Sequence, residues 1–502
     1  MTARGGLLLG VDIGTASSKG VLVDPDGAVL ARSVREHAVS TPRPGWVEHD
    51  AEDVWWADFT AITADLVRAA EGRALAGLGL SGIGPCLLAA DEAGTPLRPA
   101  ILYGVDTRAG AEITELNEEF GVDEILARSG SPLTSQAVGP KVRWLARHEP
   151  DVYARTKKLL MASSFLVHRL TGRYVLDHHS ASQCTPLYDL AAGEWAKDWA
   201  ERVAPGLDLP ELLWPTEIAG EVTAAAAELT GLPRGLPVTA GTVDAWAEAT
   251  SVGVRAPGDV MIMYGTTMFL IQVLTEPRPH PGLWGTRGVL PGSFTLAAGM
   301  ATSGAITDWL RRLVGRDYGD LVADAVTVPA GSRGLLVLPY FAGERTPLFD
   351  PDARGILAGL TTGHGAAEIY RAALEGIAYG VRHNLEAMAQ AGGAAGRLVA
   401  VGGGTRGGTR GGLWTRIVSD VTGLEQQIPA ETIGACLGDA LLAAEATGVE
   451  VDPVRGNPIA ETVVPDPANV ALYEDFYRQY RALYPATSDI AHFLAAQQHA
   501  AR

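Results

Sequence analysis

The first strand-turn-strand stretch, residues 7–24, limits what this chain can fold into more than any other part of the sequence. It reads LLLGVDIGTASSKGVLVD, with an apolar run over Leu7 to Val11, a turn at Gly14-Thr15 and a second apolar run over Gly20 to Val23. A polar turn over residues 24–27 then leads into a third run, Ala28 to Val34. Short apolar runs separated by glycine and other turn residues predict a hairpin meander.

The turn of this first hairpin also carries candidate chemistry. A Gly-Thr turn leaves backbone N–H groups free to bind an anion. Asp12 at the strand end can hold a hydrated Mg²⁺, and Lys19 can reach a phosphate as a point charge. Ser17 and Ser18 add hydroxyl donors beside it. An ordinary hairpin with a polar turn has the same composition. Because short glycine motifs often occur by chance, this stretch alone favours neither interpretation.

A second hairpin of the same kind decides between the two interpretations. Residues 260–274, VMIMYGTTMFLIQVL, run from a strand into a Gly265-Thr266-Thr267 turn and back into a strand. Two phosphate-binding candidates, one in each half of the chain, indicate a duplicated fold with a nucleotide between the halves. Asp12 with its turn, and the later Gly-Thr-Thr turn, resemble the two phosphate motifs of the FGGY family of carbohydrate kinases.

The resemblance covers about residues 7–484 and implies the fold. The family shares the actin-like, ribonuclease H-like ATPase fold, so we expect an α/β protein with two such domains and a central cleft. Residues 1–256 would form the N-terminal FGGY domain, with the sugar site, the first phosphate motif and the catalytic aspartate. Residues 257–485 would form the C-terminal FGGY domain, with the second phosphate and adenosine motifs, and residues 486–502 a tail. A chain of 502 residues is long enough for this division.

Composition argues against several other classes of protein. A net charge of −18 and a pI near 5.1 make nucleic acid or an anionic membrane a poor partner. The three cysteines, Cys86, Cys184 and Cys436, are isolated, and no CxxC occurs. Neither a disulfide framework nor a thiolate metal site is therefore expected, and the expected compartment is a reducing cytoplasm. No run of about eighteen apolar residues occurs, so no transmembrane helix is expected.

Residues 237–254, PVTAGTVDAWAEATSVGV, contain the candidate for the chemical step. A short strand reaches Ala240, Gly241 makes a turn, and Asp244 opens a helix whose dipole stabilises an ionised carboxylate. Such a carboxylate at a cleft can take the proton of a sugar hydroxyl during phosphoryl transfer. From the residues alone, a plain N-cap aspartate is the more common case. The resemblance reverses this preference, because the family's catalytic base lies in this strand-turn-helix and Asp244 is the matching position.

Two stretches resemble the family near its sugar cleft. The motif PGW-x-E marks Trp46, and Asp50 just after it is a helix N-cap candidate with Asp53 three positions later. The second stretch resembles a Trp-x-Asp-x-Arg motif that lines the sugar pocket, with Tyr in place of Trp and one extra residue. Its members here are Tyr103, Asp106 and Arg108. An Asp and an Arg two residues apart can form hydrogen bonds to the hydroxyls of a polyol. More often, such residues form an ion pair on the surface.

The overall look is nearest to the xylulokinases within the family. In those, a Met-His-Gly falls on Gly84-Pro85-Cys86 and an Asp-Asn pair falls on Asp244-Ala245. The His and Asn that bind sugar hydroxyls are therefore missing here, and Trp246 fills some of that space. Such losses matter because a site built to hydrogen-bond a hydroxyl discriminates strongly. A ketopentose such as D-xylulose is the leading substrate, and another ketose, a deoxy sugar, a sugar acid or a polyol are alternatives.

The second half carries the most specific motifs. Residues 343–347, GERTP, match the family as they stand, and residues 355–375 match its C-terminal signature. A predicted strand over residues 398–401 ends in Gly402-Gly403-Gly404, where glycines let a flat ligand approach the backbone. In the family this loop, here continued by Thr405, receives the adenosine. Residues 405–408, TRGG, are repeated at once as residues 409–412. This tandem insertion would lengthen a loop over the nucleotide or weaken nucleotide binding.

The resemblance therefore implies a phosphotransferase with an alcohol acceptor, acting on a small sugar with ATP as co-substrate and Mg²⁺ as cofactor. Asp12 would hold Mg²⁺ through water. Many relatives are dimers, so a homodimer stays open. The alternative from another class is a non-catalytic actin-like sensor or scaffold, against which the intact Asp12, Lys19 and Asp244 argue. The predicted ATP-binding residues are Asp12, Gly14, Thr15, Ser17, Ser18, Lys19, Gly265, Thr266, Thr267, Gly402, Gly403, Gly404 and Thr405.

Overall fold

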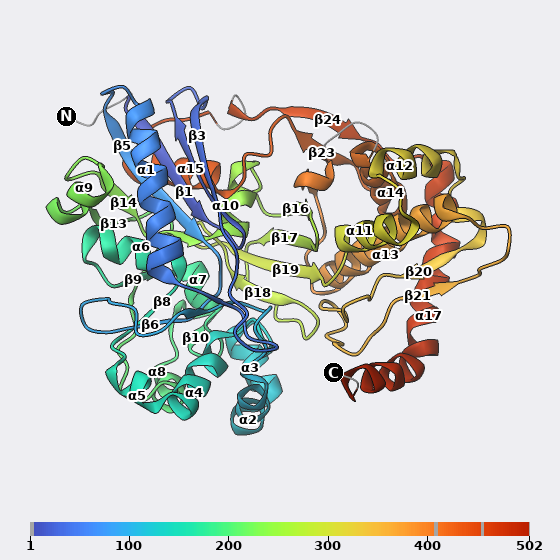
Figure 1. The fold of residues 1–502 in the computed structure, drawn as a ribbon, viewed down its shortest axis with the longest axis horizontal. Helices are drawn as coiled ribbons and strands as arrows, with labels where there is room; N and C mark the ends of the chain where they lie inside the picture. The colour runs from blue at the N-terminus through green and yellow to red at the C-terminus, as the bar shows by residue number, and fades with distance from the viewer. Residues whose placement is uncertain (1–4, 406–409, 453–455, 501–502) are drawn as a thin grey trace.

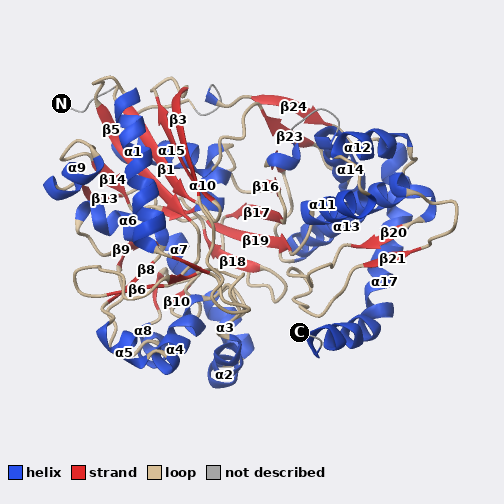
Figure 2. Ribbon diagram, viewed as in Figure 1, coloured by secondary structure: helices blue, strands red, loops and turns tan. Residues whose placement is uncertain are grey.

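The computed structural model describes residues 5–405, 410–452 and 456–500. The chain forms two halves, coloured mainly blue to green and yellow to red in Figure 1, and a large mixed sheet lies in each. In the described ranges each of these sheets has seven strands. Figure 2 shows the two sheets side by side, with helices packed around them. This arrangement confirms the predicted α/β fold with two domains.

The first sheet has the strand order β13-β14-β5-β1-β2-β3, with β15 also paired to β5. Strand β1 runs antiparallel to β2 and parallel to β5. The strands are β1 (Leu7–Ile13), β2 (Ser17–Val23), β3 (Val29–Glu36), β5 (Leu75–Gly82), β13 (Ile218–Glu221), β14 (Pro237–Thr239) and β15 (Thr242–Val243).

The second sheet repeats this plan in the order β18-β19-β17-β16-β22-β23-β24. Strand β16 again pairs antiparallel with the next strand, β17, and parallel with a later one, β22. The predicted duplication is therefore visible in the topology. The strands are β16 (Asp259–Tyr264), β17 (Met268–Leu274), β18 (Trp284–Arg287), β19 (Phe294–Met300), β22 (Arg397–Val401), β23 (Gln426–Pro429) and β24 (Ile459–Val463).

Both predicted hairpins form, and the strands of the first are longer than the apolar runs that predicted them. Strand β1 is buried along its whole length, Asp12 included. It lies between β2 and β5 in the sheet, so its backbone groups are paired on both edges. The polar residues at the strand ends are therefore drawn into the ladder, which places Asp12 directly opposite Lys19.

Helices cover the sheets and connect them. They are η1 (Ala51–Trp56), α1 (Ala57–Ala69), α2 (Gly110–Phe120), α3 (Val122–Ser129), α4 (Val138–His148), α5 (Pro150–Arg155), α6 (Ala162–Thr171), α7 (His178–Ser182), α8 (Lys197–Val203), α9 (Ala224–Thr230), α10 (Asp244–Ser251), α11 (Gly304–Val314), α12 (Tyr318–Thr327), η2 (Ser332–Gly334), α13 (Ala366–Gln390), η3 (Gly403–Thr405), α14 (Arg410–Thr422), α15 (Ala435–Thr447) and α17 (Pro467–Ala500). Within the described ranges, none of these helices combines the length and apolar character that crossing a bilayer requires.

Small two-stranded pairs complete the fold. They are β4 (Glu48–His49) with β7 (Ala100–Ile101), β6 (Leu88–Ala90) with β8 (Lys158–Leu160), β9 (Val175–Asp177) with β12 (Glu211–Leu213), β10 (Tyr188–Asp189) with β11 (Glu194–Trp195), and β20 (Leu336–Leu338) with β21 (Ile356–Ala358).

Helix α15 belongs to the second half of the sequence but packs on the first sheet (Figure 1). Glycines make this contact possible. A Cβ atom added at Gly10 would lie 1.9 Å from the carbonyl oxygen of Cys436, and one at Gly79 would lie 1.9 Å from that of Asp439. On α15 itself, a Cβ at Gly438 would lie 1.8 Å from the carbonyl oxygen of Ala247 in α10. Because no side chain fits at these points, α15 is held directly between the first sheet and α10.

The last helix differs from the expectation of a tail after residue 485. Helix α17 continues through this position to Ala500. Its final turns are anchored because His492 contacts Asp350 at 2.7 Å, and His499 contacts Asp352 at 3.1 Å. Ala491 is also buried against the body of the protein. The proposed domain boundary at residue 256, in contrast, lies in the connection between α10 and β16.

Candidate active site

The turns of both hairpins open onto one cleft. Its cavity volume is about 530 Å³, enough for a nucleotide phosphate chain and a small acceptor. Residues from both halves of the sequence line it, so the cleft that the fold class predicts is present. The predicted site residues that line it are Asp12, Gly14, Thr15, Ser17, Lys19, Gly84, Tyr103, Asp244, Ala245, Trp246, Thr266 and Thr267.

Asp12 lies near the end of β1, and a residue of the neighbouring strand β5 contacts its carboxylate. The hydroxyl of Ser81 lies 3.1 Å from Oδ1 of Asp12. Burial raises the pKa of Asp12 to about 6, while the nearby Lys19, Ser81 and His37 act in the opposite direction. A cation in the cleft would favour the ionised form of this carboxylate.

The first phosphate turn is braced by a residue that the sequence did not single out. His37 contacts the carbonyl oxygen of Gly14 at 3.0 Å through Nε2 and the carboxylate of Asp58 at 2.8 Å through Nδ1. Ser18 donates a hydrogen bond of 2.7 Å to the same Asp58 carboxylate. Ser18 is fully buried on the face of β2 opposite to Ser17 and Lys19, as alternation along a strand requires. The structure therefore does not bring Ser18 to the cleft, and its predicted contact with ATP is not supported.

Asp244 begins α10 just after the short strand β15, as predicted. The N-cap residue is Val243, so Asp244 is not a plain N-cap. Its Oδ1 accepts a hydrogen bond of 2.7 Å from the backbone of Ala245. Burial, followed by the negative charges of Asp12 and Glu248, raises the pKa of Asp244 well above its usual range. A carboxylate with a raised pKa at a cleft suits a general base that works near neutral pH.

The acceptor side of the cleft is lined by aromatic residues. The hydroxyl of Tyr103 lies 3.3 Å from that of Thr15, which links this side to the first phosphate turn. Trp246 packs against the ring of His179, with centroids 3.9 Å apart, and donates a hydrogen bond of 2.9 Å to Thr295. These contacts fix the Trp246 ring beside the base. Gly84 and Ala245, which lack the long side chains of the xylulokinase pattern, line the same region.

Trp46, Asp106 and Arg108 do not line this cleft. The guanidinium of Arg108 is completely buried and pairs with Asp106 at 2.7 Å and with Glu48 at 2.8 Å. Its Cζ atom lies 4.0 Å from the centre of the Trp46 ring. These groups satisfy one another, so the alternative of an ion pair describes Asp106 and Arg108, although this pair is buried rather than on the surface. Pro85, a buried neighbour of Gly84, is likewise absent from the lining.

The second phosphate turn and the triple glycine lie next to each other. The carbonyl oxygen of Gly265 accepts hydrogen bonds from the backbone of Gly304 at 3.0 Å and the hydroxyl of Ser303 at 2.9 Å, which fixes the turn. Gly402 has a φ of +94°, and a Cβ there would lie 2.6 Å from the carbonyl oxygen of Tyr264. Gly265 and the predicted adenosine residues Gly402, Gly403, Gly404 and Thr405 flank the cavity without lining it. Residues 406–409 of the TRGG repeat lie outside the described residues.

Several lining residues were not predicted as site residues, and four of them have polar or aromatic side chains. Arg345 lies in the GERTP motif, which was recognised without a role, and Glu248 was taken as structural. Burial raises the pKa of Glu248 to about 7. Gln136 and Phe269 also line the cleft; Phe269 belongs to the second hairpin, which was recognised for its turn, whereas Gln136 lies in no motif that could have indicated this.

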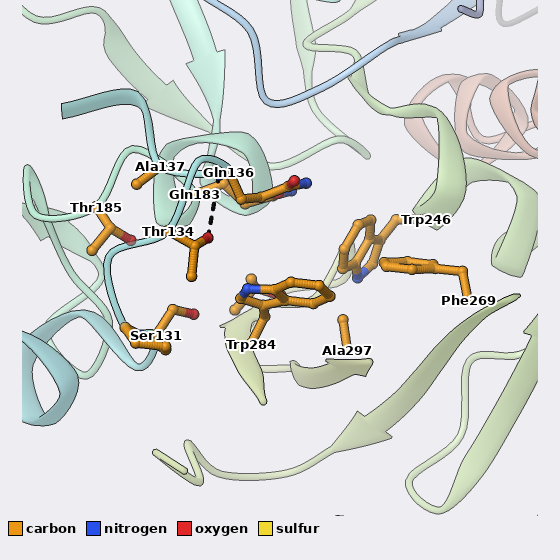
Figure 3. A pocket seen from close by; sticks show the side chains of 12 residues that line it. Ser131, Thr134, Gln136, Ala137, Gln183, Thr185, Trp246, Phe269, Trp284 and Ala297 are labelled. Carbon is orange, nitrogen blue, oxygen red and sulfur yellow. Dashed lines mark hydrogen bonds between the residues drawn. The ribbon is translucent and has the colours of Figure 1, made fainter. Parts of the chain in front are cut away.

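A second, smaller cavity adjoins the acceptor side (Figure 3). Its volume is about 20 Å³, which is room for about one water molecule and too small for a sugar. Gln136, Trp246 and Phe269 line both cavities, and Trp284 lies between the last two and Ser131 in the view of Figure 3. Of these two cavities, only the larger cleft has room for a sugar.

Comparisons with known proteins agree with this site. Residues 7–251 match the model of the FGGY family of carbohydrate kinases, N-terminal domain, and residues 260–447 match its C-terminal domain. The chain is 29% identical to a xylulose kinase of Lactococcus lactis over 97% of its length and 98% of the relative. It is 31% identical to a glycerol kinase of Alkalilimnicola ehrlichii over 88% of its length and 90% of the relative.

Among solved structures, xylulose kinase from Rhodospirillum rubrum superimposes with a TM-score of 0.89 at 33% sequence identity, over 97% of this chain and 100% of that one. The two family models together span residues 7–447 with a short gap, and the shared fold covers 97% of the chain. The chain belongs to the FGGY family of carbohydrate kinases and is an ATP-dependent phosphotransferase with an alcohol group as acceptor.

Proposed function

We propose that this chain transfers the γ-phosphate of ATP to a hydroxyl of a small sugar, with a ketopentose such as D-xylulose as the leading acceptor and Asp244 as the base. One observation carries the proposal: Asp244 and residues of both Gly-Thr turns line the same cavity. Phosphoryl transfer depends mainly on positioning and charge neutralisation, so a base beside a phosphate cradle is the arrangement that it requires.

The lining residues divide the work between them. Thr15 and Ser17 from the first half, with Thr266 and Thr267 from the second, donate hydrogen bonds to phosphate oxygens. Lys19 neutralises phosphate charge. Asp244 accepts the proton of the acceptor hydroxyl while that oxygen attacks the γ-phosphorus and ADP leaves. Binding between the two halves also excludes water, which would otherwise compete as the acceptor.

Mg²⁺ is the cation that this chemistry implies, and the residues present fit it. Magnesium prefers carboxylate oxygens and water. Asp12, Asp244 and Glu248 all line the cleft; burial, followed by the negative charges of the other two, raises the pKa of Asp244. Asp12 would hold the ion through water. When bound, the ion neutralises charge on the phosphate groups.

The choice of acceptor rests on similarity and on the shape of the pocket. The relatives at 29% identity include xylulose kinases, and this supports D-xylulose. Pro85 and Ala245 stand where the xylulokinase pattern has the His and Asn that bind sugar hydroxyls, so we expect the hydroxyl contacts of this pocket to differ. Another ketose, a sugar acid or a polyol would fit a cleft of this size.

A coupled assay of ADP release with MgATP tests the proposal. The acceptor panel should contain ketoses, polyols and sugar acids, and Asp244→Ala serves as the control. We expect release that depends on one class of acceptor, and we expect Asp244→Ala to lower kcat by roughly 10²–10⁴-fold because it removes the general base. Normal turnover by Asp244→Ala would contradict the role of Asp244. Bound nucleotide without acceptor-dependent release would contradict these acceptors.

A further inference from the structure

Arg345 is a cation in the cleft; burial lowers its pKa, and the charges of Tyr103 and Glu344 oppose that change. It lines the cavity together with Tyr103, Gln136 and Asp244. Its Cζ atom lies 4.7 Å from the centre of the Trp284 ring. No ion pair or hydrogen bond between described residues involves its guanidinium. A buried arginine elsewhere in the chain, Arg371, is satisfied by Glu375 at 2.9 Å. Removing a guanidinium from water without a hydrogen-bond partner costs free energy. We therefore expect a bound ligand to accept hydrogen bonds from Arg345.

The second half of the chain holds Arg345 in this position from both sides. The Oε1 atom of Glu344 accepts hydrogen bonds of 2.8 Å from the backbone N–H groups of Ala301 and Arg345. On the other side, the hydroxyl of Thr346 accepts one of 2.7 Å from the backbone of Gly299. A Cβ atom at Gly299 would lie 3.2 Å from Nη1 of Arg345, so the guanidinium rests against the backbone of β19. Its direction is therefore fixed by the fold.

The groups around Arg345 supply hydrogen-bond donors. The side-chain oxygen of Gln136 already accepts a hydrogen bond of 3.0 Å from the backbone of Gly104, which leaves its NH₂ group to donate. In Figure 3 this side chain extends toward Trp246 at the boundary between the two cavities. Burial raises the pKa of Tyr103, and the positive charge of Arg345 opposes that change, which places the guanidinium near the acceptor side.

The donors define what they can bind. A guanidinium has five N–H donors and no acceptor, and the NH₂ group of Gln136 adds two donors beside the one lone pair that its oxygen still has. A ketone or carboxylate oxygen satisfies them without bringing a hydrogen of its own. A hydroxyl can accept from them too, but its hydrogen then needs an acceptor. The carboxylates that line the cleft are Asp12, Asp244 and Glu248, of which the first two already serve the metal and the reacting hydroxyl in the proposed mechanism.

We propose that Arg345 and Gln136 bind an oxo or carboxylate oxygen of the acceptor, at a distance from its reacting hydroxyl, so that ketoses and sugar acids are selected over polyols. This inference rests on the proposed function, because it assigns the acceptor class of the same cleft. The ketone of a ketose and the carboxylate of a sugar acid share the chemistry that the donors recognise.

Calorimetric binding without ATP tests the inference on the full-length protein. The ligands are D-xylulose, D-xylonate and xylitol, which share five carbons but carry a ketone, a carboxylate and neither group. We expect xylitol to bind about 10–100-fold more weakly than the better of the other two, as expected for loss of a hydrogen bond to a charged group. Preference for D-xylulose would assign the bound oxygen to a ketone, and preference for D-xylonate to a carboxylate.

Variants then connect this preference to the donors. Arg345→Met should weaken the preferred ligand by about 10–100-fold and leave xylitol nearly unchanged, so that the ratio approaches 1. Gln136→Leu should act in the same direction, and Arg345→Lys should retain part of the preference. Arg478→Met, an exposed arginine on α17, is the matched control and should change nothing. Thermal unfolding of each variant checks that it remains folded.

Several outcomes would overturn the inference. Equal binding of xylitol and the other two ligands by the wild type is one, and absence of binding by all three is another. A uniform loss for all ligands in both Arg345→Met and Arg345→Lys would indicate a structural role. The binding ratio does not depend on phosphoryl transfer. Selective binding without acceptor-dependent ADP release would therefore refute the proposed function alone, whereas turnover with an unchanged ratio in Arg345→Met would refute the inference alone.

Discussion

Asp177 is a buried carboxylate outside the cleft that joins two elements of the acceptor side. Its Oδ1 accepts hydrogen bonds from the backbone of Ser180 and from the hydroxyl of Thr242, each at 3.1 Å. Thr242 lies two residues before Asp244, so this contact supports the strand that positions Asp244. Burial raises the pKa of Asp177 to about 6, while the hydrogen bonds oppose that change.

The pKa of Asp177 predicts a dependence of stability on pH. A carboxyl whose pKa is higher in the folded state than in the unfolded state holds its proton more tightly when folded, so stability falls as pH rises from about 4 to about 6. Asp177→Asn removes this titration and keeps an oxygen for both donors. We expect the midpoint of thermal unfolding of the wild type to fall relative to that of Asp177→Asn between pH 4 and pH 7. A constant difference over this range would contradict the assignment.

At single positions, the sequence predicted the site where a motif is local and failed where the fold turns a side chain away. Asp12 and Asp244 follow directly from their strand-turn patterns, and both line the cleft. Ser18 did not follow the pattern, because alternation along β2 points it to Asp58. The contact of Gln136 with the cleft depends on packing between distant segments, and no local pattern encodes it.

Among the elements, the start of the helical segment before α1 was predicted from its cap. The carboxylate of Asp50 accepts hydrogen bonds of 2.9 Å from the backbone N–H groups of Glu52 and Asp53. The first turn that it caps, η1, is a π-helix, a rare form that the sequence did not indicate. Cap chemistry depends on two or three neighbouring residues and can be recognised in the sequence, whereas no local pattern indicated the π-helical form of this turn.

This cap gives a prediction with a close control. Asp50→Ala should reduce the free energy of unfolding by about 1 kcal/mol, because two backbone donors lose their acceptor. Asp53→Ala removes an exposed carboxylate from the same turn without removing a cap. It should reduce the free energy of unfolding by only a few tenths of the loss expected for Asp50→Ala. Chemical unfolding followed by tryptophan fluorescence measures both. Equal losses would indicate that charge in the first turn, rather than capping, stabilises the helix.

For the whole molecule, the sequence predicted the duplicated topology. It did not predict that α15, from the second half of the sequence, packs on the first sheet. Two matching hairpins in one chain predicted a duplicated fold, and the resemblance to the FGGY family implied two α/β domains with a cleft between them. The packing of α15 on the first sheet depends on Gly10, Gly79 and Gly438, whose close contacts join segments more than 350 residues apart in the case of Gly79 and Asp439. Glycine occurs in strands for several structural reasons, so the sequence alone does not show that α15 packs against Gly10 and Gly79.

This contact predicts an unusually large effect of a small substitution. Gly79→Ala would place a Cβ atom 1.9 Å from the backbone of α15, so the helix must move or separate from the sheet. We expect a loss of several kcal/mol in stability and a fall in activity, because α15 also contacts the helix that carries Asp244. Gly110→Ala, at the start of α2 with open space around it, is the control and should have little effect. Thermal unfolding and ADP release measure the two effects, and similar behaviour of both variants would contradict the prediction.

The position of α15 also has a consequence for synthesis on the ribosome. The first sheet is translated by about residue 243, but the helix that covers one of its faces ends at Thr447. For the intervening two hundred residues, the emerging chain would expose an apolar sheet face that its own later sequence must cover. The nascent chain is therefore a candidate for chaperone binding during this interval, and release from the chaperone would follow the emergence of α15 rather than completion of the first half.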